Sequence, residues 1–81
     1  MRIDKFLKVS RVVKKRSVAK MLADNEKIKV NEKIAKPSTE VDIDDEIELI
    51  FGEKRLKIRV AAILNNPKKE DAATMIEIIE Q

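Results

Sequence analysis

The stretch with the clearest potential for chemistry is Lys14–Lys20, where three consecutive cations lead into Ser17 and then into small apolar residues. Serine is a preferred N-cap, because its hydroxyl accepts a hydrogen bond from a free backbone N–H of the first helical turn. We therefore expect a helix to begin at Ser17, with Lys15 and Arg16 at its end. Unpaired N–H groups and the helix dipole favour an anion such as phosphate there. A basic run alone is equally compatible with a solvated loop.

Composition excludes several other kinds of site. The chain has no cysteine and no histidine, so it offers neither thiolate or imidazole metal ligands nor a neutral-pH acid–base group. The acidic run Asp42–Glu46 lacks the glycine and the distant glutamate of a calcium loop, and is interpreted as a solubilising turn. Because Gly52 is the only glycine, no glycine-rich phosphate loop exists. We expect a protein without catalytic activity, metal or cofactor.

Charge is distributed unevenly along the chain. Residues 1–36 contain 12 Lys or Arg against 4 Asp or Glu, whereas residues 37–81 contain 6 against 11. A molecule of this kind can present its basic side to a polyanion while its other side keeps it soluble. Charge does not by itself distinguish a nucleic acid from an anionic membrane. No apolar run is long enough for a signal peptide or a membrane span, so a cytoplasmic protein is expected.

Two short helices are predicted near the N-terminus. Ile3, Phe6 and Leu7 recur at helical spacing, which indicates an amphipathic helix over residues 3–9. A second helix from Ser17 should bury Val18, Ala19, Met21 and Leu22 and end near Asn25, which can adopt a left-handed cap. The predicted core includes the following side chains: Ile3, Phe6, Leu7, Val18, Leu22, Ile28, Val30 and Ile47.

Strands are predicted for the rest of the chain. Residues 27–30 and 33–35 alternate polar and apolar around Asn31-Glu32 and predict a hairpin, which a loop at Pro37 follows. A second hairpin is expected from residues 46–51 and 54–64, with Gly52 in its turn. The cations of its return strand either extend the positive surface or pair with neighbouring glutamates, and we favour pairing.

The last part of the chain is predicted as a polar loop and a short strand. Residues 65–71 contain Pro67 and charged residues, as is typical of a loop, whereas residues 74–79 are rich in isoleucine and fit an edge strand or a final helical turn. Phe6 and Phe51 are both expected in the core, so no aromatic platform for single-stranded bases is predicted. One α+β domain accounts for residues 1–81.

Several separated motifs resemble, in the same order, the S4-type RNA-binding domain. They are Arg2–Leu7, Arg16–Ala19, Val30-Asn31, Lys36–Ser38 and Val41 with Asp45–Ile47. The resemblance implies the S4-type (alpha-L) fold, with two short N-terminal helices packed on a small curved antiparallel sheet. It covers a motif core at residues 2–52 and leaves residues 53–81 as a C-terminal strand extension.

Over nearly its full length the chain is similar to the RqcP group of short stand-alone bacterial S4 proteins. This resemblance implies a monomer that binds 23S rRNA and peptidyl-tRNA on an obstructed large ribosomal subunit. It also implies support for C-terminal alanine tailing of the stalled chain by a partner protein, without involvement of a membrane. The alternatives are another noncatalytic module for structured RNA or ribosome assembly, and an adaptor that binds a protein or a membrane.

The resemblance also assigns roles to individual residues. Arg2 and Arg16 fall at the arginine positions of the motif, where a guanidinium can hold phosphate with two N–H groups, and Asp4 is expected to orient one of them. Arg16 is expected to lie free of the buried stripe, so that its loss would not reduce stability. Further contacts to RNA are expected from these residues: Lys5, Lys8, Arg11, Lys15, Ser17, Lys20, Asn31, Lys36 and Ser38.

Glutamate occupies two positions where the S4 pattern usually has glycine, Glu26 and Glu32. A residue other than glycine at positive φ costs on the order of 1 kcal/mol. We therefore expect either rearranged turns or a left-handed conformation at Asn25 and Asn31.

Overall fold

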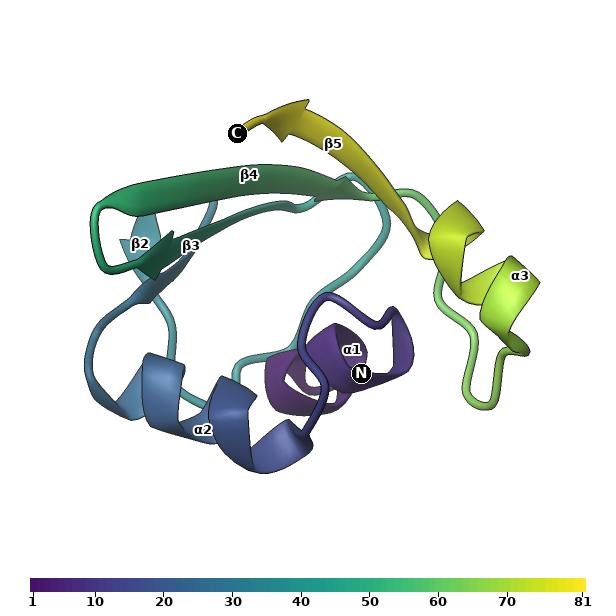
Figure 1. Ribbon diagram of the computed structural model, residues 1–81, viewed down its shortest axis with the longest axis horizontal. Coiled ribbons are helices and arrows are strands. Elements are labelled where there is room, and N and C mark those ends of the chain that lie inside the picture. Colours follow the sequence, from purple (N-terminus) through teal and green to yellow (C-terminus); the bar gives the residue numbers. More distant parts are fainter.

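A five-stranded antiparallel sheet lies over two short helices in the computed structural model, which covers residues 1–81 (Figure 1). The strands are arranged in the order β2-β1-β3-β4-β5. Their bounds are β1 Ile28–Val30, β2 Lys33–Ile34, β3 Glu46–Phe51, β4 Lys54–Val60 and β5 Ile76–Glu80. The helices are α1 Ile3–Val9, α2 Arg16–Asp24 and α3 Lys69–Ala72, and a 3-10 turn, η1, spans Ala73–Met75. The predicted α+β class and the two N-terminal helices packed on an antiparallel sheet are confirmed.

Helix α1 has the predicted bounds and places Ile3, Phe6 and Leu7 in the core, where each is fully buried. Its C-terminal end differs from the usual pattern. The residue that follows the C-cap, Arg11, has φ 64°, a left-handed conformation that helix ends most often give to glycine. Its N–H donates to the carbonyl of Lys8 at 3.0 Å. An arginine in this conformation costs on the order of 1 kcal/mol.

The N-cap of helix α2 lies two residues earlier than predicted, so the assignment of Ser17 as its N-cap was wrong. The N-cap is Lys15, whose extended backbone carries no side-chain cap and whose carbonyl accepts the N–H of Val18 at 3.0 Å. Ser17 is therefore an exposed residue inside the first turn. The side chain of Arg16, the first residue of the helix, is held by Asp4, a contact that the local sequence does not reveal.

Glu26 and Glu32, which stand where the S4 pattern usually has glycine, both adopt the left-handed conformation, and Asn31 does so as well. After α2, Asn25 has φ −96° and Glu26 has φ 60°, so the predicted left-handed conformation of Asn25 was wrong. In the β1–β2 hairpin, Asn31 and Glu32 both have positive φ, 49° and 70°, as a two-residue type I′ turn requires. Asn25 contributes differently, because its Nδ2 donates to the carbonyl of Met21 at 2.7 Å.

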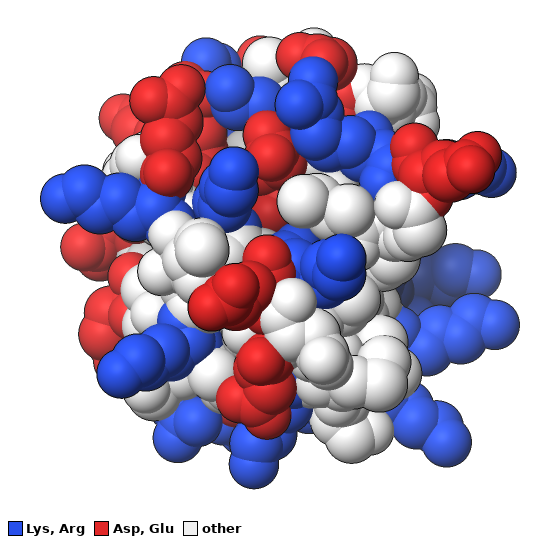
Figure 2. Space-filling model, turned by 90° about the vertical axis from the view of Figure 1, so that its left-hand side faces the viewer, with Lys and Arg blue, Asp and Glu red and all other residues white.

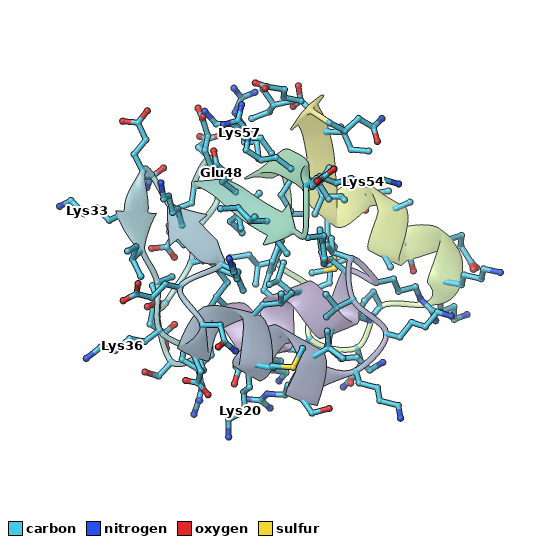
Figure 3. All side chains as sticks on the ribbon, turned by 60° about the vertical axis from the view of Figure 1, so that its left-hand side comes forward. Lys20, Lys33, Lys36, Glu48, Lys54 and Lys57 are labelled. Carbon is cyan, nitrogen blue, oxygen red and sulfur yellow. The ribbon has the colours of Figure 1, made fainter.

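The outer face of the sheet carries a network of ion pairs. Arg59 lies opposite Glu46 and Lys57 lies opposite Glu48 in the β3–β4 register, and Figure 3 shows Lys57 and Glu48 side by side. Lys57 and Arg59 both pair with Glu46, at 3.4 and 3.8 Å. The preferred interpretation, pairing of the β4 cations with neighbouring glutamates, is thereby confirmed. These cations are partly neutralised, which leaves the helical side of the molecule as the positive one.

Arg55 extends the same network of ion pairs to β5, near the C-terminus. Its Nη2 donates to Oε1 of Glu80 at 2.8 Å, and its Nη1 lies 3.9 Å from Oε2 of Glu48. The hydrogen bond to Glu80, together with the charges of Glu48 and Glu80, raises the pKa of Arg55 above its ordinary value.

The core lies between the helices and the inner face of the sheet. Most of the predicted core is buried there, including Leu22, Ile28 and Ile47, whereas Val18 and Val30 are half-buried at its edge. Two predicted members do not belong to it. Met21 is 54% exposed because it lies on the outer side of α2, and Phe51 is 37% exposed because it is the last residue of β3, beside the hairpin turn.

The chain after β4 contains more regular structure than predicted. The segment expected as a loop from residue 65 to 71 ends in the short helix α3, whose Ala72 is buried. The η1 turn follows and buries Met75 completely. Of the two structures predicted for residues 74–79, the edge strand is found from residue 76 as β5, which pairs with β4 alone, whereas Thr74 and Met75 lie in η1. No helix of the protein combines the length and apolar character needed to cross a membrane.

Candidate nucleic-acid interface

Asp4 is the centre of the basic surface, although it is 1% exposed. Its Oδ2 accepts a hydrogen bond from Nη2 of Arg2 at 3.1 Å, and its Oδ1 accepts one from Nη2 of Arg16 at 3.2 Å. The backbone N–H of Lys5 donates to Oδ1 at 2.7 Å. One buried carboxylate therefore holds two guanidinium groups from different elements, and not only one as predicted.

The surrounding backbone fixes the position of Asp4. The loop that contains Pro37 packs against the start of α1, where the N–H of Ile3 donates to the carbonyl of Thr39 at 2.7 Å and that of Asp4 donates to the carbonyl of Pro37 at 3.3 Å. Both backbone donors would otherwise lack a partner, as the first N–H groups of a helix do. The loop thus anchors the first turn of α1 and brings Lys36 and Ser38 to the same end of the molecule.

The two arginines remain available to a ligand. Their side chains are 44% and 46% exposed, and each uses one terminal nitrogen on Asp4. A guanidinium has five N–H donors, so Arg2 and Arg16 both retain donors that point to solvent. Two guanidinium groups held side by side by one carboxylate form a rigid donor surface that matches the oxygens of a phosphate. The arrangement can bind a polyanion and offers no nucleophile or general base.

The other predicted basic residues surround this pair without carboxylate partners. Lys15 and Lys20 are exposed at the start and on the outer side of α2, and Lys20 and Lys36 extend away from the body in Figure 3. Lys57 is the only lysine of the chain that pairs with a carboxylate. In Figure 2, acidic and basic side chains alternate at the top, over the sheet, while lysines and arginines extend from the lower edge, on the side of the helices.

The side chain of Asn31, which was predicted to contact RNA, forms hydrogen bonds within the protein. Its Nδ2 donates to Oδ1 of Asp45 at 3.1 Å and its Oδ1 accepts the N–H of Glu46 at 3.0 Å. These bonds tie the β1–β2 turn to the start of β3. The side chain that was predicted to contact RNA is therefore occupied within the protein.

A hollow at the other end of α1 was missed by the sequence analysis. It has a volume of about 210 Å³ and is lined by Lys8, Val9, Arg11, Asn65, Asn66 and Pro67. Only Lys8 and Arg11 were predicted to contact RNA. The two asparagines lie in a segment that was interpreted as a loop without a function. The only sequence feature there that could have suggested a binding site is the pair of lysines that follows Pro67.

Comparison with known proteins adds an independent result to this geometry. The family model described as the S4 domain matches residues 1–47, which include both arginines and Asp4. The chain belongs to the S4 domain family. Within this family it is 51% identical over 81 residues to the RQC P-site tRNA stabilizing factor of Streptococcus pneumoniae, with 100% of this chain and 92% of that protein covered. The factor of the same name from Bacillus subtilis is 43% identical, with 100% and 94% covered. The chain thus also belongs to the group that these factors form.

Solved structures agree with the S4 assignment. Heat Shock Protein 15 of Vibrio cholerae, described as trimeric, superposes with a TM-score of 0.87 at 29% identity, covering 98% of this chain and 81% of that one. The solution structure of the hypothetical protein HP1423 gives a TM-score of 0.82 at 29% identity, with 100% and 99% covered. The predicted S4-type fold is therefore confirmed, and both superpositions cover nearly the whole chain.

Proposed function

We propose that this S4 protein binds the RNA of an obstructed large ribosomal subunit, both 23S rRNA and peptidyl-tRNA, and acts there in ribosome-associated quality control. It holds the tRNA without catalysing a reaction, works in the cytoplasm, and supports alanine tailing of the stalled chain by a partner protein. The observation that carries the proposal is the pair of half-exposed guanidinium groups, Arg2 and Arg16, fixed by the buried carboxylate of Asp4. The names of the relatives support the tRNA as one ligand.

Charge and composition support structured RNA as the ligand class. Cations on the helical side such as Lys15 and Lys20 have no carboxylate partner, whereas three cations of β4, Arg55, Lys57 and Arg59, are paired with carboxylates. No exposed tyrosine or tryptophan is available for stacking on bases, because the chain contains neither residue. Arginine, lysine and backbone groups bind phosphates and read the shape of folded RNA instead.

Binding is expected to be strongly salt-dependent. Each phosphate that a lysine or arginine neutralises releases a condensed counterion, so the logarithm of the affinity falls linearly with the logarithm of the salt concentration. For about five such contacts we expect a loss of 10²- to 10³-fold between roughly 50 and 200 mM salt. Fluorescence anisotropy with a labelled tRNA transcript measures this slope. An affinity that stays constant over this range would contradict the phosphate-contact assignment and favour the adaptor alternative.

Arg2→Ala and Arg16→Ala should each weaken RNA binding about ten- to a hundredfold, because each removes a charge-assisted contact of roughly 1.5–3 kcal/mol. The buried position of Asp4 corrects the expectation that Arg16 is dispensable for stability. Its loss leaves Oδ1 of Asp4 with the Lys5 N–H alone, so the melting temperature should fall moderately. Binding must therefore be compared at a temperature where each variant is folded.

Lys20→Ala is the matched control, since it removes an exposed cation from α2 that contacts no carboxylate. It should lose less affinity than either arginine variant. Sedimentation of tagged protein from a lysate, followed by sequencing of crosslinked RNA, tests the function itself. Comigration with large subunits that carry tRNA supports the proposal, while association only with free or precursor RNA would favour a ribosome-assembly module. An Arg16→Ala protein that is folded and still comigrates like the wild type would refute the site.

A further inference from the structure

Arg11 differs from every other arginine of the chain. Arg2 and Arg16 pair with Asp4, and Arg55 and Arg59 pair with glutamates of the sheet, but Arg11 has no carboxylate partner. It also occupies the left-handed position after α1 with φ 64°, where glycine would be unstrained. Backbone strain of this kind is concentrated at functional sites. The side chain of Arg11 thus stabilises nothing in the fold that would explain its presence there.

Arg11 lines the hollow at the C-terminal end of α1, and this hollow also contains two side chains with free hydrogen-bonding groups. Asn25 and Asn31 use their amides within the fold, whereas Asn65 and Asn66 are exposed and make no side-chain hydrogen bond. A carboxamide can both donate to and accept from a hydroxyl, whereas a phosphodiester, which has no proton to donate, can pair only with its N–H groups. The hollow therefore combines two cations, Lys8 and Arg11, with two carboxamides that can each donate and accept a hydrogen bond.

The size of the hollow limits what it can hold. Its volume of about 210 Å³ lies below the roughly 300–1,000 Å³ of typical small-molecule pockets. A fragment of a larger molecule, anionic and with an adjacent hydroxyl, fits these features. A ribose with its phosphate is such a fragment, and the 2′-hydroxyl can donate to and accept from an amide.

We propose that this hollow binds one ribose–phosphate unit of RNA, with Lys8 and Arg11 on the phosphate and Asn65 and Asn66 on the 2′-hydroxyl. The loop before α3 thereby becomes part of the RNA-binding surface, although it lies outside the residues matched by the S4 model. Figure 1 shows this loop descending beside the helical layer. The two sites are separated by the length of α1, about 10 Å for seven residues, so a single RNA helix can cover both. This inference rests on the proposed function.

The test compares an RNA hairpin with its 2′-O-methylated counterpart, which keeps A-form geometry but lacks the hydroxyl donor. By fluorescence anisotropy, wild-type protein should bind the RNA hairpin several-fold more tightly than the methylated one. The double variant Asn65→Ala/Asn66→Ala should bind both equally, with an affinity for the methylated hairpin within about twofold of wild type. A double variant that keeps the wild-type preference would overturn the ribose assignment.

Arg11→Gly tests the cationic part of the hollow. It should bind both hairpins about tenfold more weakly while its melting temperature rises, because glycine relieves the strain at φ 64°. A purely structural arginine would instead give a lower melting temperature. Lys54→Ala is the control for charge, since Lys54 is an unpaired cation at the hairpin end of β4 and should change affinity by less than twofold. An Arg11→Gly protein with wild-type affinity would overturn the inference.

The outcomes also separate this inference from the proposed function. If Arg16→Ala weakens binding and the variants of the hollow do not, only the inference fails. If wild-type protein binds neither hairpin, both fail. If binding depends on the hollow but wild type binds the two hairpins equally, the hollow contacts the phosphate alone and the ribose assignment fails.

Discussion

Replacing Phe6 with alanine should lower the free energy of unfolding by about 3–5 kcal/mol, the range measured for buried phenylalanines. Phe6 is completely buried and heads the series of large buried side chains. It lies in α1, which has seven residues and is too short to be stable alone. Its contact with the core therefore holds the helix that carries Arg2, Asp4 and Lys8. For a domain of this size, with a total stability of roughly 4–12 kcal/mol, a loss of this magnitude removes much of the margin.

Phe51→Ala is the matched control for Phe6→Ala. The deleted atoms are the same, but Phe51 is 37% exposed at the end of β3, so its loss should cost only about 1–2 kcal/mol. Urea denaturation monitored by circular dichroism measures both variants. RNA binding should be lost together with folding for Phe6→Ala and retained for Phe51→Ala. Equal destabilisation by the two substitutions would show that the helix–sheet contact does not dominate the core.

The sequence predicted well those helices and strands whose pattern of apolar and polar residues lies within the element itself. Apolar spacing alone fixed α1, and strict alternation fixed β3 and β4 with their shared ion pairs. The prediction for Phe51 failed for a geometric reason. Alternation places a side chain on one face of a strand, but burial also depends on what covers that face at each position. The covering residues are remote in sequence, and Phe51, the last residue of β3, is left partly exposed beside the turn.

The candidate site was predicted only in part, for a related reason. The resemblance identified Arg2, Asp4 and Arg16, but a helical wheel of α1 places Asp4 with the polar residues and gives no indication of its burial. That burial results from the loop at Pro37 and from Arg16, which lies twelve residues later in the chain. The start of α2 was misplaced because its N-cap, Lys15, has no capping side chain and therefore gives no local signal. The hollow at Arg11 likewise joins residues that are more than fifty positions apart.

Asp4→Asn should weaken RNA binding at least tenfold, even though it removes a negative charge from the RNA-binding surface. Asparagine keeps the shape of the side chain but can accept from only one of the two guanidinium groups, and its amide turns a donor toward the other. Arg2 and Arg16 then repel each other and are no longer held in one orientation. Loss of charge-assisted hydrogen bonds of roughly 1.5–3 kcal/mol should also lower the melting temperature.

The sign of the change in affinity distinguishes the two possible roles of Asp4. If the carboxylate contributed only its charge, its neutralisation would reduce repulsion of phosphates and tighten binding. Asp24→Asn measures this effect alone, because Asp24 is exposed at the end of α2 and pairs with no cation; we expect a slight gain in affinity there. Titration of labelled tRNA at a temperature where all three proteins are folded gives the comparison. If folded Asp4→Asn protein binds at least as tightly as the wild type, Asp4 does not position the arginines, and the two guanidinium groups act as independent charges.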